Sequence, residues 1–522
     1  MASRSITVRE AVIDLLRSFG TTTIFGNPGS TELPLFRAFP NDFRYVVGLQ
    51  ESVVLAMADG YAQATRNAAI INLHSATGVG HAMGSLFTAF RNRTPLVITA
   101  GQQARAILPT EPFLFSQQAA ELPKPYVKWS NEPARAEDVP AAIARAYYLA
   151  MQPPQGPTFV SIPVDDWDRE TAPLAARQVS TALRGDPAQL AALGDALDGA
   201  KRPALVVGSG VDRDGAFDLV VTLAERHGAP VWASPNISRC SFPESHPLFA
   251  GFLPANKPAI VQRLTGHDVV LALGAPVFTY HTEGAGPFLP ADTRLFQMID
   301  DADTASWLPT GTSILTSLHL GIADLLARPA PPTRSRPPGR TRAPRVTPGA
   351  TISVDYLMQT IAELRPPGSI IAEEAPTSRA SMQNHMPIDR SQGFFTCASG
   401  GLGFGLPAAI GVALGKPGDK VIAVIGDGSS MFAIQGLWTA GQLELPMTFV
   451  IIRNGRYQAL EDFGVHFGLA PPGTKLPALD FVALAAGHGI AGHRIDRPDA
   501  LHGALRNAFA ADKPVLVEVV VD

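Results

Sequence analysis

Two polar residues end apolar runs near the C-terminus and are spaced for metal chemistry. Asp427 ends the run in KVIAVIGDG, residues 420–428, and Asn454 ends the run MTFVIIRN, residues 447–454. A helical stretch separates the runs, so a right-handed βαβ unit would bring both residues to one edge of a parallel sheet. With the backbone carbonyl of Arg456 they would form a sparse oxygen site, suited to Mg²⁺ that keeps water and phosphate ligands.

The residues after Asp427 favour a phosphate at the same place. Gly428 and Ser429 open a helix, where free backbone amides attract anions. Asp-Gly after a strand is often only a turn. The paired Asn454 therefore carries the prediction of a metal and diphosphate site.

Apolar runs like these recur along the chain and alternate with helical patterns, which is typical of buried parallel strands joined by crossover helices. The predicted fold class is α/β with parallel sheets. The runs occupy residues 22–26, 68–75, 95–101, 157–163, 203–210, 268–276, 420–428 and 447–454.

One segment interrupts this alternation. Residues 328–350 are rich in Pro and Arg and lack apolar periodicity, which predicts an extended linker. A second, softer boundary lies near residue 173. We therefore predict domains at residues 1–180, 181–340 and 350–522.

Composition narrows the classes of partner. Of 522 residues, 46% are hydrophobic and 17% charged, which supports a large core, and the net charge of −4 offers no basic surface for nucleic acid or anionic membranes. The cysteines, Cys240 and Cys397, exclude a disulfide framework. Residues 6–20 predict a structural helix with acidic residues, not a targeting signal. Without a long apolar run we expect no membrane span and a soluble, cytoplasmic protein.

Longer motifs make the chain recognisable. GDGS followed by NG is accompanied by FGNPGSTELP, GLQES, ADGYAQAT, INLHSATGVGHAMG, TAGQQAR, GAPVFTYH and ASGGLGFGLPAAIG. Together they resemble the thiamine-diphosphate-dependent 2-oxo acid decarboxylases, above all the benzoylformate decarboxylases. The resemblance implies three doubly wound parallel-sheet domains, pyrimidine-binding, central and diphosphate-binding, with thiamine diphosphate and Mg²⁺ as cofactors.

The resemblance assigns cofactor contacts. Glu51 matches the glutamate that bonds a pyrimidine nitrogen, although an acid that opens a helix is also favoured by the dipole alone. Gly400 matches the carbonyl that binds the aminopyrimidine, and Leu402 the residue that bends the cofactor; a packing role for these glycines stays open. The segment EEAPTS, residues 373–378, departs from the family pattern. The other matched cofactor contacts are Thr377, Ser378, Gly428, Ser429 and Tyr457.

Substrate residues follow from the same match. His74 and His281 correspond to two proton-carrying histidines, and Ser30 to the serine that holds the substrate carboxylate, with a helix-capping role as the alternative. Thr396 stands where the family has an aromatic residue, which leaves the substrate side chain open. The matched apolar wall consists of Leu114, Ala459, Leu460 and Phe463.

The expected reaction is the non-oxidative decarboxylation of a 2-oxo acid through a thiamine ylid and an enamine, with benzoylformate as the first candidate and a place in the mandelate pathway of aromatic catabolism. The resemblance also implies a site shared between subunits, hence a homo-oligomer such as a dimer of dimers. Open alternatives are another aryl or aliphatic 2-oxo acid, a carboligase or lyase of the acetolactate synthase or aldehyde lyase type, and a non-catalytic homologue. VVGSGV, residues 206–211, is only a partial nucleotide fingerprint, because no acid ends the next strand.

Overall fold

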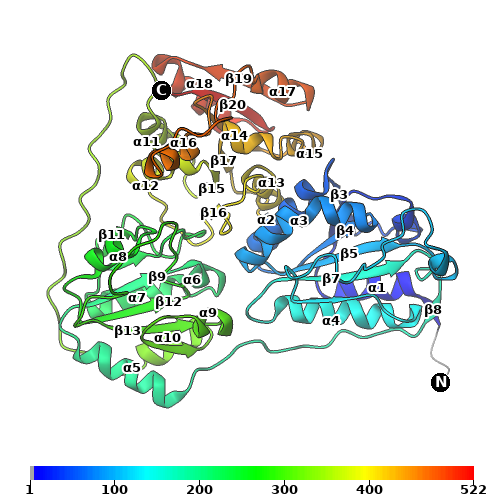
Figure 1. The fold of residues 1–522 in the computed structure, drawn as a ribbon, viewed down its shortest axis with the longest axis horizontal. Helices are drawn as coiled ribbons and strands as arrows, with labels where there is room; N and C mark the ends of the chain where they lie inside the picture. Colours follow the sequence, from blue (N-terminus) through cyan, green and yellow to red (C-terminus); the bar gives the residue numbers. More distant parts are fainter. Residues whose placement is uncertain (1–4) are drawn as a thin grey trace. The chain divides into compact units, whose positions relative to one another are not determined.

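Three principal parallel sheets organise the chain, and the computed structural model describes residues 5–522 (Figure 1). The chain divides into two compact units. The first comprises the chain up to Val179 with Thr347–Ala380 and Ser399–Asp522; the second comprises Ser180–Val346 and Ser381–Ala398. The predicted α/β class with parallel sheets is confirmed.

The N-terminal sheet of the first unit has the strand order β3-β2-β4-β5-β7-β6, with every neighbouring pair parallel. The predicted N-terminal helix is observed as α1, whose start is fixed by a capping box of Thr7 and Glu10. The strands are β2 (Thr23–Gly26), β3 (Arg44–Val47), β4 (Ala69–Leu73), β5 (Leu96–Gln102), β6 (Trp129–Asn131) and β7 (Pro157–Pro163), and β1 (Ile6–Thr7) pairs with β8 (Glu170–Thr171). The helices are α1 (Val8–Ser18), α2 (Glu51–Thr65), α3 (Ser75–Asn92) and α4 (Val139–Met151), with short 3₁₀ turns η1 (Ser30–Phe36), η2 (Arg105–Thr110) and η3 (Ala136–Asp138).

The C-terminal sheet of the first unit contains the order β15-β17-β18-β20-β19, again parallel throughout. Its strands are β15 (Ile370–Glu374), β17 (Val421–Gly426), β18 (Met447–Arg453), β19 (Ala491–Ile495) and β20 (Val515–Val520). The helices of this region are α11 (Val354–Leu364), α12 (Arg379–His385), α13 (Gly405–Gly415), α14 (Asp427–Met431), α15 (Gly436–Gln442), α16 (Gln458–His466), α17 (Phe481–Gly487) and α18 (Pro498–Ala510), with the 3₁₀ turn η4 (Pro376–Ser378).

The second unit holds a parallel sheet of order β11-β10-β9-β12-β13-β14. Its strands are β9 (Pro203–Val207), β10 (Val231–Ala233), β11 (Phe249–Phe252), β12 (Val269–Leu273), β13 (Arg294–Ile299) and β14 (Thr312–Leu315), and β16 (Phe394–Thr396) lies in its last segment. The helices are α5 (Pro187–Gly199), α6 (Ser209–Arg213), α7 (Phe217–His227), α8 (Lys257–Leu264), α9 (Ala302–Ser306) and α10 (Leu318–Leu326).

Each apolar run named from the sequence contains an observed strand. Between α10 and α11 the described chain has neither helix nor strand, as predicted for the Pro- and Arg-rich linker. Part of this linker is nevertheless anchored, because the Arg334 guanidinium donates to the carbonyls of Leu197, Asp198 and Ala200 at the end of α5. The exact domain boundaries stay a prediction. Among the helices of residues 5–522, none has both the length and the apolar character that a membrane crossing needs.

The VVGSGV segment is used for internal packing. The N–H groups of Gly208 and Gly210 donate to the carbonyls of Leu273 and Gly274, at the end of β12. A Cβ atom on Gly208 would lie 2.4 Å from the Gly274 oxygen, so the strand ends approach too closely for any side chain. The N–H groups of Gly208 and Gly210 are therefore already used in hydrogen bonds to the backbone at the end of β12.

The two sheets of the first unit are joined by helices α2 and α13, which lie side by side (Figure 1). Two glycines set their separation. A Cβ on Gly60 would stand 2.1 Å from the Ala408 oxygen, and one on Gly411 would stand 1.8 Å from the Met57 oxygen. The helices thus meet backbone to backbone, which holds the start of α2 close to the segment that leads into α13.

We expect Gly411→Ala to lower the free energy of unfolding by about 3 kcal/mol, because the added methyl group collides with a backbone carbonyl that cannot rotate away. Gly503→Ala is the matched control: Gly503 is also helical, and a Cβ there meets nothing within 4 Å. That change should stabilise the helix by about 0.5–1 kcal/mol. Thermal unfolding of both variants measures the difference, and equal midpoints would contradict the tight contact.

Candidate functional site

Three strand ends meet at one edge of the C-terminal sheet. β17 lies between β15 and β18, with Glu374 opposite Ile425 and Gly426 opposite Ile452. Asp427 follows β17 and Asn454 follows β18, so the structure brings these two residues to the same edge. The Asp427 carboxylate accepts a hydrogen bond of 2.7 Å from the N–H of Gly455, directly after Asn454. Carboxylate and amide oxygens therefore share one loop cluster.

The Asp427 carboxyl group is buried, and burial raises its pKa against the lowering effect of backbone donors. One of those donors corrects the sequence analysis: the Gly428 N–H is not free, because it donates to Asp427 Oδ1 at 2.8 Å. The Asn454 side-chain oxygen accepts from the N–H of Arg456 at 3.1 Å. Within residues 5–522 no group of three or more His, Cys, Asp and Glu side chains is arranged to hold a metal ion. A cation at this edge would therefore rely on Asp427, neutral oxygens and ligands from outside the protein.

The residues assigned to the diphosphate lie around the same edge. A Cβ on Gly428 would stand 2.3 Å from the Tyr457 ring, so only glycine permits Tyr457 to lie there. Helix α16 begins next to Tyr457 and contacts η4, which contains Thr377 and Ser378. Ser378 and Ser429 are buried, whereas Thr377 is exposed. Hydroxyl groups and a glycine thus converge from the ends of β15, β17 and β18.

Glu374 holds the glycine-rich segment that leads into α13. Its buried carboxylate accepts from the N–H groups of Gly403 and Phe404 at 2.7 Å each and from that of Gly405. Gly400 and Gly403 have φ values of +74° and +98°, which favour glycine. Burial raises the pKa of Glu374 to about 7, although the three backbone donors oppose the shift.

The role of Glu374 was missed from the sequence. Its only signal there is the pair of acids that ends an apolar strand, at Glu373 and Glu374. Leu402, in the same segment, is partly buried. The arrangement gives the loop that carries Gly400 and Leu402 a fixed shape before any ligand binds.

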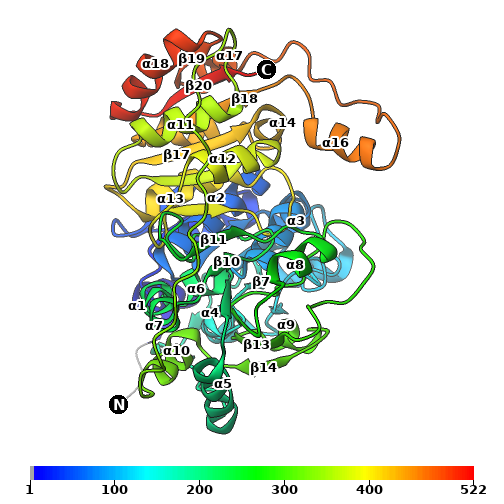
Figure 2. The ribbon, with the colours of Figure 1, turned by 90° about the vertical axis from the view of Figure 1, so that its left-hand side faces the viewer.

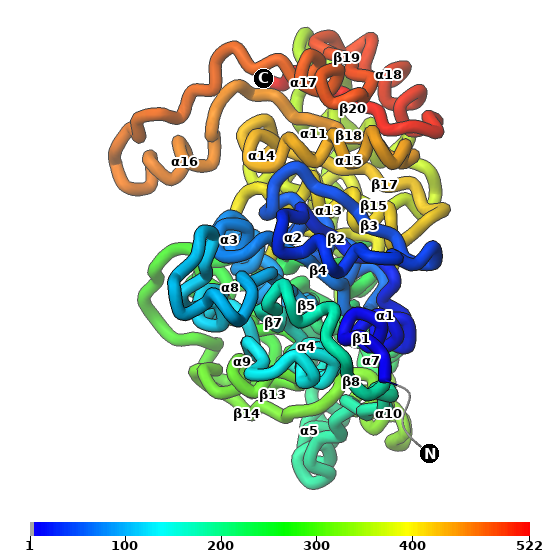
Figure 3. Tube along the Cα trace, turned by 90° about the vertical axis from the view of Figure 1, so that its right-hand side faces the viewer, coloured from blue at the N-terminus to red at the C-terminus, as the bar shows by residue number. Residues whose placement is uncertain are grey.

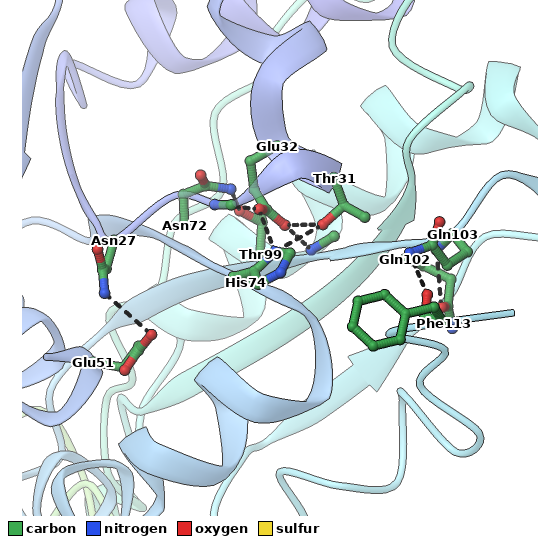
Figure 4. A network of polar contacts seen from close by, with 12 residues as sticks. Asn27, Thr31, Glu32, Glu51, Asn72, His74, Thr99, Gln102, Gln103 and Phe113 are labelled. Carbon is green, nitrogen blue, oxygen red and sulfur yellow. Dashed lines mark hydrogen bonds and ion pairs between the residues drawn. The ribbon is translucent and has the colours of Figure 1, made fainter.

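A second buried carboxylate orients His74 in the N-terminal sheet (Figure 4). Glu32 is 1% exposed and accepts from the N–H groups of Gly29 at 2.8 Å and Gly101 at 2.9 Å, and from the Thr31 hydroxyl at 2.6 Å. His74 Nδ1 lies 2.9 Å from Glu32 Oε2. Because an ionised carboxylate only accepts, Nδ1 carries a proton and Nε2 is the nitrogen left for other chemistry.

The sequence analysis did not identify Glu32, because the contact joins residues 42 positions apart. Ser30 lies just before it, exposed, as the first residue of η1. The alternative role of Ser30 as a helix cap is wrong, since Gly29 occupies the cap position and its N–H donates to the Glu32 side chain. The Ser30 hydroxyl is thus not used to begin the helical turn.

Glu51 begins α2, but its side chain does not cap the helix. Gln50 does so by accepting from the N–H groups of Ser52 and Val53. The Glu51 carboxylate is instead held laterally: Asn27 Nδ2 lies 3.3 Å from Oε1 (Figure 4), and His81 Nδ1 lies 3.1 Å from Oε2. Glu51 as a residue is only 8% exposed. A purely dipolar role for this acid would not need those lateral contacts.

The remaining predicted residues lie on loops and on α16 of the first unit or in the second unit. His281 is exposed in the loop after β12, and Thr396 is buried at the end of β16, both in the second unit. Leu114 follows η2 and has φ of +64°. The other residues of the predicted apolar wall, which lie on α16, are Ala459, Leu460 and Phe463.

Helix α16 lies on a long excursion from the C-terminal sheet (Figures 2 and 3). Apolar side chains on it and directly after it are largely uncovered: Val465 is 79% exposed, and Phe467, the residue after the helix, 69%. Isolated exposed apolar residues are ordinary, whereas several close together on one short segment form an apolar surface patch.

We predict energetic coupling between Glu32 and His74. The two changes Glu32→Gln and His74→Leu should be non-additive in unfolding free energy by about 1 kcal/mol, because Glu32→Gln removes the charge of the acceptor and His74→Leu removes the donor of their shared hydrogen bond. Thermal unfolding of both single variants and the double variant measures this. Glu32→Gln combined with Gly503→Ala serves as the additive control. Additivity of the first pair would contradict the contact.

We predict that Glu374 makes stability depend on pH. Its folded-state pKa of about 7 lies above the ordinary value of 4.5 for a glutamate, so the stabilisation is fully present at pH below 4.5 and is lost as pH rises through about 7. Glu374→Gln removes this titration. The difference in unfolding free energy between variant and wild type should therefore move in the variant's favour from pH 4.5 to pH 7. A difference that is constant over this range, or that moves in the opposite direction, would contradict the assignment.

Comparison with known proteins agrees with this geometry. Residues 6–120, 190–319 and 377–519 match family models for the N-terminal TPP binding, central and C-terminal TPP binding domains of thiamine pyrophosphate enzymes. The chain is 43% identical to benzoylformate decarboxylase of Pseudomonas aeruginosa over 520 residues, 98% of each chain.

Two solved structures are also similar. The thiamine diphosphate-dependent 4-hydroxybenzoylformate decarboxylase of Rhodococcus jostii RHA1 has a TM-score of 0.96 and 41% identity, with 99% of each chain covered. Benzoylformate decarboxylase of Polynucleobacter necessarius has a TM-score of 0.97 and 38% identity, with 99% of this chain and 98% of that chain covered. The chain therefore belongs to the family of thiamine-pyrophosphate-dependent decarboxylases.

Proposed function

We propose that this enzyme decarboxylates benzoylformate to benzaldehyde and CO₂, with thiamine diphosphate and Mg²⁺ as cofactors. The observation that carries the proposal is the full-length identity of 43% to a benzoylformate decarboxylase. Two similar structures, both of aryl 2-oxo acid decarboxylases, support it. The family membership makes thiamine diphosphate the cofactor. The substrate and the metal are the parts proposed.

The chain's own residues fit both ends of the cofactor. Asp427, Asn454 and the carbonyl of Arg456 would hold Mg²⁺, while the buried hydroxyls of Ser378 and Ser429 would bind the diphosphate. Thr377, Gly428 and Tyr457 complete that group. The cradle is narrow, since a Cβ on Gly428 would meet the Tyr457 ring.

Glu51 would bond the pyrimidine at the other end, and Gly400 and Leu402 would position its ring. The bound cofactor supplies an electron sink for the pair released when CO₂ leaves. The buried position of Glu51 suits this task, because burial strengthens a single well-aimed hydrogen bond.

Proton delivery falls to the histidines. The C–C bond to the carboxylate breaks, CO₂ leaves, and a proton must reach the former keto carbon. His74 would carry a proton on Nε2, because its Nδ1 is bonded to Glu32. His281 would serve as the second proton carrier, and the Ser30 hydroxyl would hold the substrate carboxylate. Leu114, Thr396, Ala459, Leu460 and Phe463 would surround the aryl group.

The protein would act as a homo-oligomer in the cytoplasm. The exposed apolar residues Val465 of α16 and Phe467 directly after it support burial against a second copy. The two cysteines, Cys240 and Cys397, are both free, which fits a reducing compartment.

The test supplies purified protein with benzoylformate, thiamine diphosphate and Mg²⁺ and measures CO₂ and benzaldehyde. We expect turnover with benzoylformate, and for Glu51→Gln a loss of at least about a hundredfold with unchanged thermal unfolding. A panel of aryl, straight-chain and branched 2-oxo acids defines the side chain. Near-normal turnover by Glu51→Gln would refute the role given to Glu51.

The other outcomes separate the remaining functions. An acyloin as sole product would identify a carboligase, and release of CO₂ only from aliphatic acids would move the substrate away from benzoylformate. If no acid in the panel is decarboxylated, the proposed activity is wrong.

A further inference from the structure

Glu51 is contacted by a second side chain, His81, which lies within the motif INLHSATGVGHAMG but received no role in the sequence analysis. His81 lies on α3, and its Nδ1 is 3.1 Å from Glu51 Oε2. Gly78, three residues earlier on the same helix, faces the same acid, since a Cβ there would lie 3.4 Å from Glu51 Cγ. Residues three apart share a helix face. One face of α3 is thus built around the Glu51 carboxylate.

The two contacts of Glu51 are unequal. Asn27 Nδ2 reaches Oε1 at 3.3 Å, and His81 Nδ1 reaches Oε2 at the shorter 3.1 Å. When the carboxylate is ionised it only accepts, so the ring Nδ1 donates to Oε2. When Glu51 takes up a proton, Oε2 is still occupied as an acceptor. The proton is then directed to Oε1.

We propose that His81 is a positioning residue for catalysis: its Nδ1–H fixes Oε2 of Glu51, so that Oε1 is the oxygen that gives and takes the proton. This inference rests on the proposed role of Glu51 toward the cofactor pyrimidine. The His81 side chain is 57% exposed, and that of Glu51 only 11%. The histidine thus contributes little to the core, and its position is explained better by what it does to Glu51.

The test separates hydrogen bonding from shape. His81→Leu removes the donor while keeping similar bulk, and His81→Asn keeps an N–H donor one bond beyond Cγ, where the ring has Nδ1. His493→Leu is the matched control, since His493 is exposed on β19 of the other sheet. The readout is the rate at which the C2 proton of bound thiamine diphosphate exchanges in D₂O, followed by proton NMR. Tryptophan fluorescence titration measures cofactor affinity in parallel.

For His81→Leu we expect exchange to slow about tenfold while the Kd for thiamine diphosphate stays within about threefold, because only the aim of Glu51 changes. For His81→Asn and His493→Leu we expect exchange within about threefold of the wild-type rate. A merely structural role would change affinity and thermal unfolding, and would leave the two His81 variants equally slow.

Contrary results fall into two groups. Three outcomes would show that the positioning role is wrong while the proposed function stands. In the first, His81→Leu exchanges at the wild-type rate while Glu51→Gln is strongly slowed. In the others, the Asn and Leu variants at position 81 are equally slow, or His493→Leu is slowed as much as His81→Leu. If Glu51→Gln itself exchanges at the wild-type rate, the proposed role of Glu51 fails.

Discussion

The backbone contact between α2 and α13 is the constraint on which the first unit depends. Gly60 and Gly411 face carbonyl oxygens at distances that admit no side chain. The contact ties the sheet that carries Glu51 and His74 to the sheet that carries Asp427. The axes of two helices that are separated by ordinary side chains lie roughly 8–10 Å apart. Glycine at these positions makes the contact between the two helices rigid, because backbone atoms have no side-chain rotamers through which to relax.

Buried carboxylates held by fixed donors recur throughout the site. Glu32 accepts from two backbone amides, a hydroxyl and His74; Glu374 accepts from three backbone amides at the start of α13; and Asp427 accepts from the loops after β17 and β18. Burying an acid is costly unless donors replace the lost water. Here the donors are mostly backbone N–H groups, whose direction is set by the fold. The three carboxyl groups therefore have fixed orientations before a ligand binds, which is the condition for electrostatic preorganisation.

Cofactor and substrate depend on different parts of the molecule. The strand ends of the C-terminal sheet provide the oxygen and amide groups that suit a metal and a diphosphate, and the family membership agrees with this. In the proposed function, proton transfer and cofactor activation would fall to groups elsewhere: His74, which contacts Glu32, and Glu51, held between Asn27 and His81. The apolar residues Leu460 and Val465 of α16 are exposed in the single chain.

The sequence alone determined the fold class, the strands and the pairing of Asp427 with Asn454. Buried parallel strands appear in a sequence as continuous apolar runs, and the carboxyl ends of such strands lie at one edge of the sheet. It also identified the cofactor family, through motifs that span the chain. It could not reveal Glu32 as the partner of His74 or His81 as the partner of Glu51, since each contact joins residues at least 30 positions apart and carries no local pattern. It also left a helix cap open as the alternative role of Ser30 and predicted a free amide at Gly428, and both were wrong. Local chemistry allowed those roles, but hydrogen bonds are decided by which donor the folded backbone brings within about 3 Å of an acceptor.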